Sequence, residues 1–328
     1  MVNTAEGQRV RGKSRAEERP GGDSRATIFT ALAANLVIAV AKLVAGLITG
    51  SPALLSEAAH SVADSFNELF LLTALRRARR TPDRRHPFGY GKERFFWSFL
   101  AAIGIFVTGG CFSLYQGVRA WQSPSRESGG ELVAGVIVLA VALVAESASL
   151  LKALAQARAR SSRERGLAVA DMVAEPAVRT VIAEDGTAVV GVIIALAGII
   201  LHAVTGSVRW EAAASWAIGG LLLIVATRLA VEAQRELIGQ SVDPALEDRV
   251  GEFLAAQPEI DAVLELLTMR LGPDSTLLAA RVDLHPGIDS ESIEQVCVRV
   301  KRDLHRAWPA FDHVFLDITD LDSHPDTA

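Results

Sequence analysis

The stretch from Leu55 to Ala74 carries several polar residues within an otherwise apolar run. They are Glu57, His60, Asp64, Asn67 and Glu68. Their spacings of three and four residues place all of them on one stripe of a helix. His60 and Asp64 lie one helical turn apart, so an imidazole nitrogen and a carboxylate oxygen can face one ion, as in ordinary sites for divalent transition metals. This pair is therefore the first half of a candidate metal site.

The second half lies in a later apolar segment, 180–203, which contains the adjacent acids Glu184 and Asp185. Neighbouring residues of a helix diverge by about 100°, so we expect only one of the two to face a cavity. Asp185 together with His60 and Asp64 would supply three nitrogen and oxygen ligands. A fourth ligand can come from Glu184, from Asn67 or from water. Three protein ligands with an exchangeable fourth suit an ion that must be released.

Polar residues inside apolar helices have a second use, because their side chains can join helices by hydrogen bonds. We assign this role to Asn35, Ser61 and Glu146. A charge at the centre of a bilayer costs about 2.5–3.5 kcal/mol, so a histidine with several acids requires more than packing, and we favour the metal site for His60 and Asp64. Lys152 is expected to extend to the membrane interface, whereas Lys42 can do the same or pair with acids.

The elements that must position these residues are apolar segments long enough to cross a bilayer, which takes about 20 residues. The segments are 27–49, 52–75, 95–118, 131–155, 180–203 and 212–232. Arginine and lysine gather before the first segment and in the connections 76–94 and 158–165. Every other connection is thus basic, which predicts six spans with both termini in the cytoplasm. Residues 1–26 lack the apolar core of a secretory signal, and we expect a disordered cytoplasmic tail.

The segment after the last span reads as a small soluble domain. Asp243 and Pro244 form a helix start, and the stretches 262–271 and 276–284 alternate like strands around a Gly-Pro-Asp-Ser turn. A helix from residue 289 or 290 to 307 and a strand at 313–318 follow. The predicted fold class is an all-α six-helix transmembrane domain plus a small α+β (α-β-β-α-β) cytoplasmic domain. The domains are 1–26, 27–232, 240–320 and 321–328.

The basic connection contains Asp83 and His86, which can bind a metal at the cytoplasmic mouth. A turn shaped by proline and glycine, with arginines facing lipid head groups, is the alternative, and we favour it because only two ligands are visible. The histidines of the C-terminal segment have no close spacing, which favours a solvated surface. They are His285, His305, His313 and His324.

Composition excludes several classes of protein. Half of the 328 residues are hydrophobic and the formal net charge is −5, which argues against nucleic-acid binding. The two cysteines, Cys111 and Cys297, form no CxxC motif. A membrane enzyme such as an intramembrane metalloprotease would need HExxH or a comparable motif, which the sequence lacks. We therefore expect a protein that is not an enzyme.

Three motifs together resemble the cation diffusion facilitators, a family of metal/proton exchangers. They are LLSEAAHSVAD from Leu54, TPD with HPFGYG between Thr81 and Gly91, and EDGTAVVGVIIA from Glu184. The resemblance covers 27–320 and is strongest to the branch of the ninth animal zinc transporter. It implies a transport site on His60, Asp64 and Asp185.

The sequence departs from the family pattern at three places. Val181 occupies a position where many members have a second ligand of the fifth span, so Glu184 is a substitute or the site has three protein ligands. Tyr90 occupies the place of a second loop histidine. The last strand lacks the His-x-Asp of the tail metal cluster in some members, which implies a C-terminal domain that dimerises without sensing metal.

The expected protein is a homodimer in a bacterial inner membrane that exports a divalent metal in exchange for protons. One imidazole with carboxylates and no thiolate fits Zn²⁺ best and also admits Fe²⁺, Mn²⁺, Co²⁺ or Ni²⁺. Metal and protons compete because the ligands must lose protons to bind metal. A membrane-anchored metal sensor or scaffold is the alternative, and it would make the acids of spans two and five dispensable.

Overall fold

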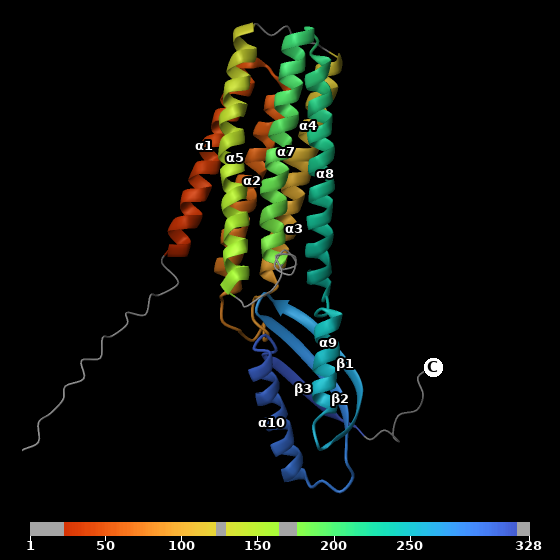
Figure 1. Cartoon of the computed structure of the whole chain (residues 1–328). Coiled ribbons are helices and arrows are strands. Elements are labelled where there is room, and N and C mark those ends of the chain that lie inside the picture. The colour runs from red at the N-terminus through yellow and green to blue at the C-terminus, as the bar shows by residue number, and fades with distance from the viewer. Residues whose placement is uncertain (1–22, 123–128, 164–175, 320–328) are drawn as a thin grey trace, which may run out of the picture.

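A helical bundle and a smaller α+β domain make up the described chain. The computed structural model describes residues 23–122, 129–163 and 176–319 (Figure 1). The bundle is formed by α1 (Asp23–Thr49), α2 (Pro52–Ala78), α3 (Glu93–Gly104), η1 (Ile105–Cys111), α4 (Phe112–Gln122), α5 (Gly129–Arg163), α7 (Pro176–Thr205) and α8 (Arg209–Ile238). The predicted tails 1–26 and 321–328 lie outside the described residues, except that α1 already begins at Asp23.

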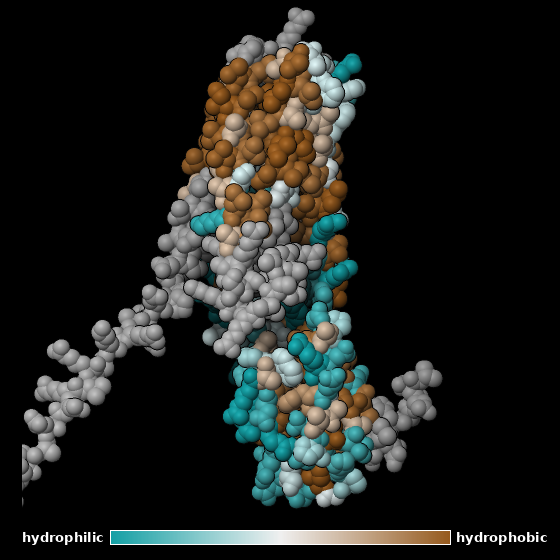
Figure 2. All heavy atoms as spheres, viewed as in Figure 1, coloured by the Kyte–Doolittle hydropathy of each residue, from teal (hydrophilic) through white to brown (hydrophobic). Residues whose placement is uncertain are grey.

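The bundle has the surface of a membrane protein. Four helical stretches are long and apolar enough to cross a bilayer: Glu93–Gln122, Leu132–Ala155, Glu184–Thr205 and Arg209–Ile238. A shorter apolar helix covers Asn35–Thr49. Hydrophobic residues cover much of the bundle face seen in Figure 2, whereas hydrophilic residues gather on the smaller domain. These stretches coincide with four of the predicted spans, and the full set of six stays a prediction.

Helix α2 lies at the centre of the bundle. It packs against α1, α3, η1, α4, α7 and α8. On its polar stripe Glu57 and His60 are buried, whereas Asp64 is partly exposed. The helix begins where the Ser51 side chain accepts a hydrogen bond from the Leu54 backbone N–H, with Pro52 in the first turn. Arg76 and Arg77 lie in its last turn, where positive charge complements the helix dipole. The acids of α2 lower its apolarity, and Glu57 is the one among them that is fully buried.

The predicted span 95–118 is a continuous rod in which η1, a π-helix, separates α3 from α4. Two glycines of η1 face α8. A Cβ added at Gly109 would lie 3.0 Å from a side-chain atom of Leu222, and one at Gly110 would lie 2.5 Å from Leu223. The missing side chains therefore allow α8 to approach the rod closely.

The C-terminal domain has the predicted α-β-β-α-β order. Its elements are α9 (Pro244–Ala255), β1 (Ile260–Gly272), β2 (Ser275–Leu284), α10 (Ser290–Ala307) and β3 (His313–Ile318). The sheet order is β1-β2-β3, with β1 antiparallel and β3 parallel to β2. Its core contains Val250, Leu254, Leu278, Val282, Val300, Leu304 and Phe311.

The two domains meet beneath the basic connection between α2 and α3. A Cβ added at Gly91 would lie 2.4 Å from the backbone oxygen of Leu271, so backbone packs on backbone at this point. An ion pair of 2.7 Å joins Arg270 Nη1 of β1 to Glu236 Oε1 at the end of α8. These contacts attach the β1–β2 hairpin to the end of the bundle.

Candidate metal site

His60 and Asp64 lie together on α2, as their spacing predicts. The His60 Nδ1 atom is 3.6 Å from Asp64 Oδ2. His60 is only 4% exposed, and neither of its ring nitrogens has a hydrogen-bond partner among the described residues. Buried polar atoms almost always have a hydrogen-bond partner or a ligand, so a ligand of the His60 imidazole is expected here. A bound metal ion would occupy one of these nitrogens.

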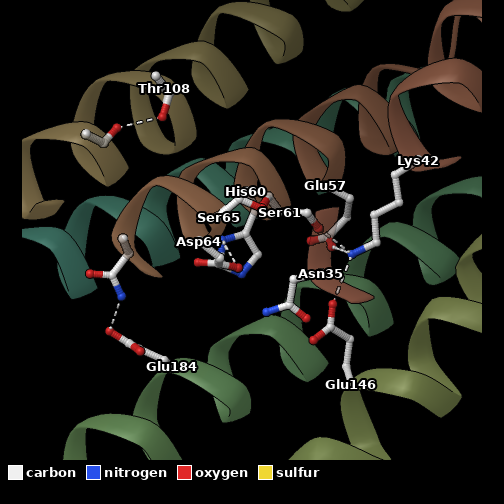
Figure 3. A network of polar contacts seen from close by, with 12 residues as sticks. Asn35, Lys42, Glu57, His60, Ser61, Asp64, Ser65, Thr108, Glu146 and Glu184 are labelled. Carbon is white, nitrogen blue, oxygen red and sulfur yellow. Dashed lines mark hydrogen bonds and ion pairs between the residues drawn. The ribbon is translucent and has the colours of Figure 1, made fainter. Parts of the chain in front are cut away.

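Glu184 and Asp185 diverge, as expected for adjacent residues of a helix. Asn67 Nδ2 donates a hydrogen bond of 2.9 Å to Glu184 Oε1, which joins α7 to α2 (Figure 3). Ser149 Oγ donates one of 3.0 Å to Asp185 Oδ2, which joins α7 to α5. The structure thus places Glu184, rather than Asp185, against the polar stripe of α2.

The predicted ligand set is not assembled around one point. Within the described residues, no group of three or more histidines, cysteines, aspartates or glutamates is placed to hold a metal ion. The structure brings His60 to Asp64 and Asn67 to Glu184, and it leaves Asp185 on Ser149. The complete set of His60, Asp64 and Asp185 with Glu184 or Asn67 stays a prediction.

Lys42, for which the sequence left two roles open, pairs with acids. Its Nζ atom donates hydrogen bonds to Glu57 Oε2 at 3.1 Å, Ser61 Oγ at 2.9 Å and Glu146 Oε1 at 3.4 Å (Figure 3). The expected helix-joining role of Ser61 and Glu146 is confirmed by these bonds. The same role is confirmed for Asn35, whose Nδ2 donates to Glu68 Oε1 at 2.6 Å.

A second polar cluster, which sequence reasoning missed, lies at the far end of the bundle from the C-terminal domain. We call Ser51, His202 and Glu211 the end cluster. Ser51 Oγ donates to one carboxylate oxygen of Glu211, and His202 Nδ1 pairs with the other. Glu211 is fully buried. The available signal was a histidine and a glutamate on either side of the short connection between two apolar segments.

The loop candidates Asp83 and His86 form a turn. Asp83 Oδ1 accepts hydrogen bonds from the backbone N–H of Arg85 and His86, and Tyr90 Oη donates to Asp83 Oδ2 at 2.7 Å. The Tyr90 hydroxyl and then the His86 N–H hold the pKa of the Asp83 carboxyl below its usual range. Asp83 and His86 are both half-exposed, with 3.4 Å between His86 Nδ1 and Asp83 Oδ1. These contacts favour the turn that the sequence suggested over a second metal site.

The C-terminal histidines are dispersed. His285 lies 3.5 Å from Asp261 and His313 lies 3.8 Å from Asp312. His305 faces the backbone oxygen of Phe311, and His324 falls outside the described residues. The described histidines of this domain thus occupy separate places.

The described structure is an apolar helical bundle with a buried histidine beside a partly exposed aspartate, and comparison with known families identifies the class of protein. Residues 28–238 match the family model described as "Cation efflux transmembrane domain". The chain therefore belongs to the cation efflux family, as its resemblance to the cation diffusion facilitators predicted.

Individual relatives point the same way. The chain is 32% identical over 265 residues to "Metal tolerance protein C4" of Arabidopsis thaliana, covering 80% of this chain and 57% of the relative. It is 31% identical over 259 residues to "Proton-coupled zinc antiporter SLC30A9, mitochondrial" of Homo sapiens, covering 78% and 45%. It is 31% identical over 134 residues to "Metal cation efflux system protein CzcD" of Cupriavidus metallidurans, covering 40% and 42%. The chain spans about half the length of these curated relatives.

Proposed function

We propose that this protein carries Zn²⁺ out of the cytoplasm in exchange for protons. The observation that carries the proposal is His60, a buried imidazole without a hydrogen-bond partner in the described structure, beside Asp64 on the central helix. Imidazole with carboxylates and no thiolate favours Zn²⁺ among the divalent metals. The names of the relatives, a zinc antiporter and metal efflux or tolerance proteins, support a metal cation as cargo.

The transport site in this proposal consists of His60, Asp64 and Asp185, with Glu184 or Asn67 completing it. Glu184 has the stronger structural support, because its carboxylate already lies against Asn67 of α2. Asp185 would need to leave Ser149 to join the pair. Binding of the ion would supply the free energy for that rearrangement, because the metal–ligand bonds form only when the carboxylates converge.

The exchange follows from the chemistry of the ligands. His60 and the carboxylates must be deprotonated to bind the metal, so cargo and protons exclude each other at one site. Open to the cytoplasm, the deprotonated site takes up the metal. Open to the other side, it takes up protons and releases the metal, and then it returns protonated.

We further propose six spans, cytoplasmic termini, an inner-membrane location and a homodimer joined by the C-terminal domains. The alternation of basic connections supports the sidedness. An apolar row on the sheet supports the dimer, since Leu267, Ala279 and Phe315 are paired in register across β1, β2 and β3. Leu267 and Phe315 are both more than half exposed. A second copy of the domain would cover this face.

The test is zinc uptake into proteoliposomes that contain a zinc-sensitive dye, under an imposed pH gradient. Wild type is compared with Asp64→Asn and His60→Ala, and Glu294→Gln at an exposed position of α10 is the control. We expect saturable flux that both site variants reduce by at least about 100-fold, because each removes a ligand, while the control keeps it.

Each contrary result has a distinct meaning. Flux that survives both site substitutions places the transport site elsewhere. A wild type that moves Mn²⁺, Fe²⁺, Co²⁺ or Ni²⁺ but not Zn²⁺ keeps the efflux function and overturns the metal. No flux of any of these ions would favour the membrane-anchored sensor.

A further inference from the structure

Lys42 is a fully buried cation in the middle of the bundle. Its side chain is 0% exposed, and all three of its hydrogen bonds go to oxygen atoms of α2 and α5. A lysine ammonium is strongly hydrated and is rarely buried in this way unless acids compensate the lost water. Here Glu57 and Glu146 provide that compensation.

The acids around Lys42 retain unused capacity for a cation. Glu57 is fully buried, and its Oε1 atom has no hydrogen-bond partner among the described residues, because Lys42 contacts only Oε2. Gly191 of α7 packs directly on this carboxylate, and a Cβ there would lie 2.4 Å from Oε1. Two carboxylates, Glu57 and Glu146, therefore face the single positive charge of Lys42.

The Lys42 cluster adjoins the candidate metal site. Glu57 lies three residues before His60 on the same helix stripe, and Ser61, which accepts a hydrogen bond from Lys42, directly follows His60. Figure 3 shows both groups within one view of the bundle interior.

We propose that Lys42 is a tethered cation of the transport cavity, which weakens metal binding at His60 and Asp64 and so promotes metal release. This inference rests on the proposed transport function. A fixed ammonium repels a divalent ion more strongly than a proton, because the repulsion scales with the charge of the ion. It also neutralises part of the acidic stripe while the metal is absent, so the empty site does not hold an uncompensated group of carboxylates.

The plainer alternative is that Lys42 only joins α1 to α2 and α5. In that case its removal would alter stability without altering the affinity of the folded protein for metal. Charge balance separates the two ideas. Lys42→Met removes one positive charge beside the site, whereas the double variant Lys42→Met/Glu57→Gln removes one positive and one negative charge.

The experiment measures Zn²⁺ affinity by competition with a zinc dye on purified protein in detergent, together with the KM for flux in proteoliposomes. We expect Lys42→Met to lower both the apparent Kd and the KM about tenfold, which corresponds to about 1.4 kcal/mol. The double variant should return to within about threefold of wild type. Lys42→Arg should resemble wild type, because it keeps the charge. Lys152→Met on the exposed part of α5 is the matched control and should change neither value.

An apparent Kd for Lys42→Met within twofold of wild type, measured on folded protein, would overturn the proposal. Should Lys42→Met fail to fold, the comparison of Lys42→Met/Glu57→Gln with Glu57→Gln decides, because these two variants differ only in the charge at residue 42, and the double variant must bind zinc more tightly if the proposal holds. Equal affinities of the two variants would overturn it. Failure of the wild-type protein to bind or carry zinc would instead contradict the proposed function. The measurements on the wild type alone reveal that outcome.

Discussion

Glu57 shows at the level of one residue how a charge is held inside this bundle. Its Oε2 atom accepts from Lys42, while its Oε1 atom faces the surface of α7 where Gly191 has no side chain. The position of this carboxylate is therefore set by an attractive contact on one side and by a lack of bulk on the other.

Gly191→Ala should disturb this arrangement more than a methyl group elsewhere in the bundle. The new Cβ would lie 2.4 Å from Glu57 Oε1, so the carboxylate or α7 must move. We expect a loss of about 1–3 kcal/mol of stability from overpacking and a reduction of zinc flux of roughly tenfold or more. The free energy of unfolding is measured in detergent, and the zinc flux is measured in proteoliposomes.

The control is Gly220→Ala on α8, where an added Cβ has no heavy atom within 4 Å. Alanine favours a helix over glycine by about 1 kcal/mol, so this variant should be neutral or more stable. Equal behaviour of the two variants would show that Glu57 adjusts freely and that the close approach has no functional weight.

The shared face of Glu57, His60 and Asp64 was predictable from the sequence, because helical spacing fixes which residues point the same way. The sequence did not predict that the Asp185 side chain lies against Ser149 of α5. Helix periodicity says that Glu184 and Asp185 diverge, but the rotation of α7 about its own axis decides which of them meets α2. Packing against α2 and α5 sets that rotation, and these contacts are distant in sequence.

At the level of elements, the end cluster ties three helices together where α2 and α8 begin and α7 ends. Glu211 accepts from Ser51 and pairs with His202, so one buried carboxylate connects the first turn of α8 with both neighbours. The same Ser51 hydroxyl caps α2. A single hydroxyl thus serves a local and a long-range contact.

His202→Ala should be strongly destabilising. It removes one partner of a buried pair and leaves Glu211 with Ser51 alone, which typically costs about 3–5 kcal/mol. The measurement is the free energy of unfolding in detergent, with Val204→Ala as control because Val204 is exposed on the same turn. If both variants lose the same small amount, the His202–Glu211 pair contributes nothing to holding α7 against α8.

Element types were easier to predict than element details. The strand at 313–318 has its predicted bounds, and the predicted strand 262–271 extends to Ile260 and Gly272. The π-helix within the predicted span 95–118 was not predicted, because hydrophobicity alone does not distinguish it from the α-helices on either side. Its geometry depends on contact with α8, which a single sequence does not reveal.

At the level of the whole molecule, the C-terminal domain is attached to the bundle through backbone contact at Gly91 and the Arg270–Glu236 ion pair. The segment after α8 turns at Gly239, whose φ of 113° is a conformation that glycine adopts without strain. The β1–β2 hairpin is therefore attached at two places, to the end of α8 through Arg270 and to the connection between α2 and α3 at Gly91.

Gly91→Ala should loosen this attachment. Its Cβ would lie 2.4 Å from the backbone oxygen of Leu271, and backbone cannot yield as a flexible side chain can. We expect protease cleavage between α8 and α9 to become at least about threefold faster, which corresponds to a loss of about 0.7 kcal/mol in the closed arrangement. Gly251→Ala on α9 is the control, since its Cβ would meet Leu266 at an ordinary 3.8 Å. Unchanged cleavage of Gly91→Ala would show that the loop gives way.

The π-helix of residues 105–111 has a consequence for the length of the chain. A π-helical turn holds more residues than an α-helical turn, because its hydrogen bonds reach one residue further. The rod of α3 and α4 therefore contains more residues at this point than an α-helix of the same length would. Removal of one residue within Ile105–Cys111 would therefore allow an unbroken α-helix from α3 to α4.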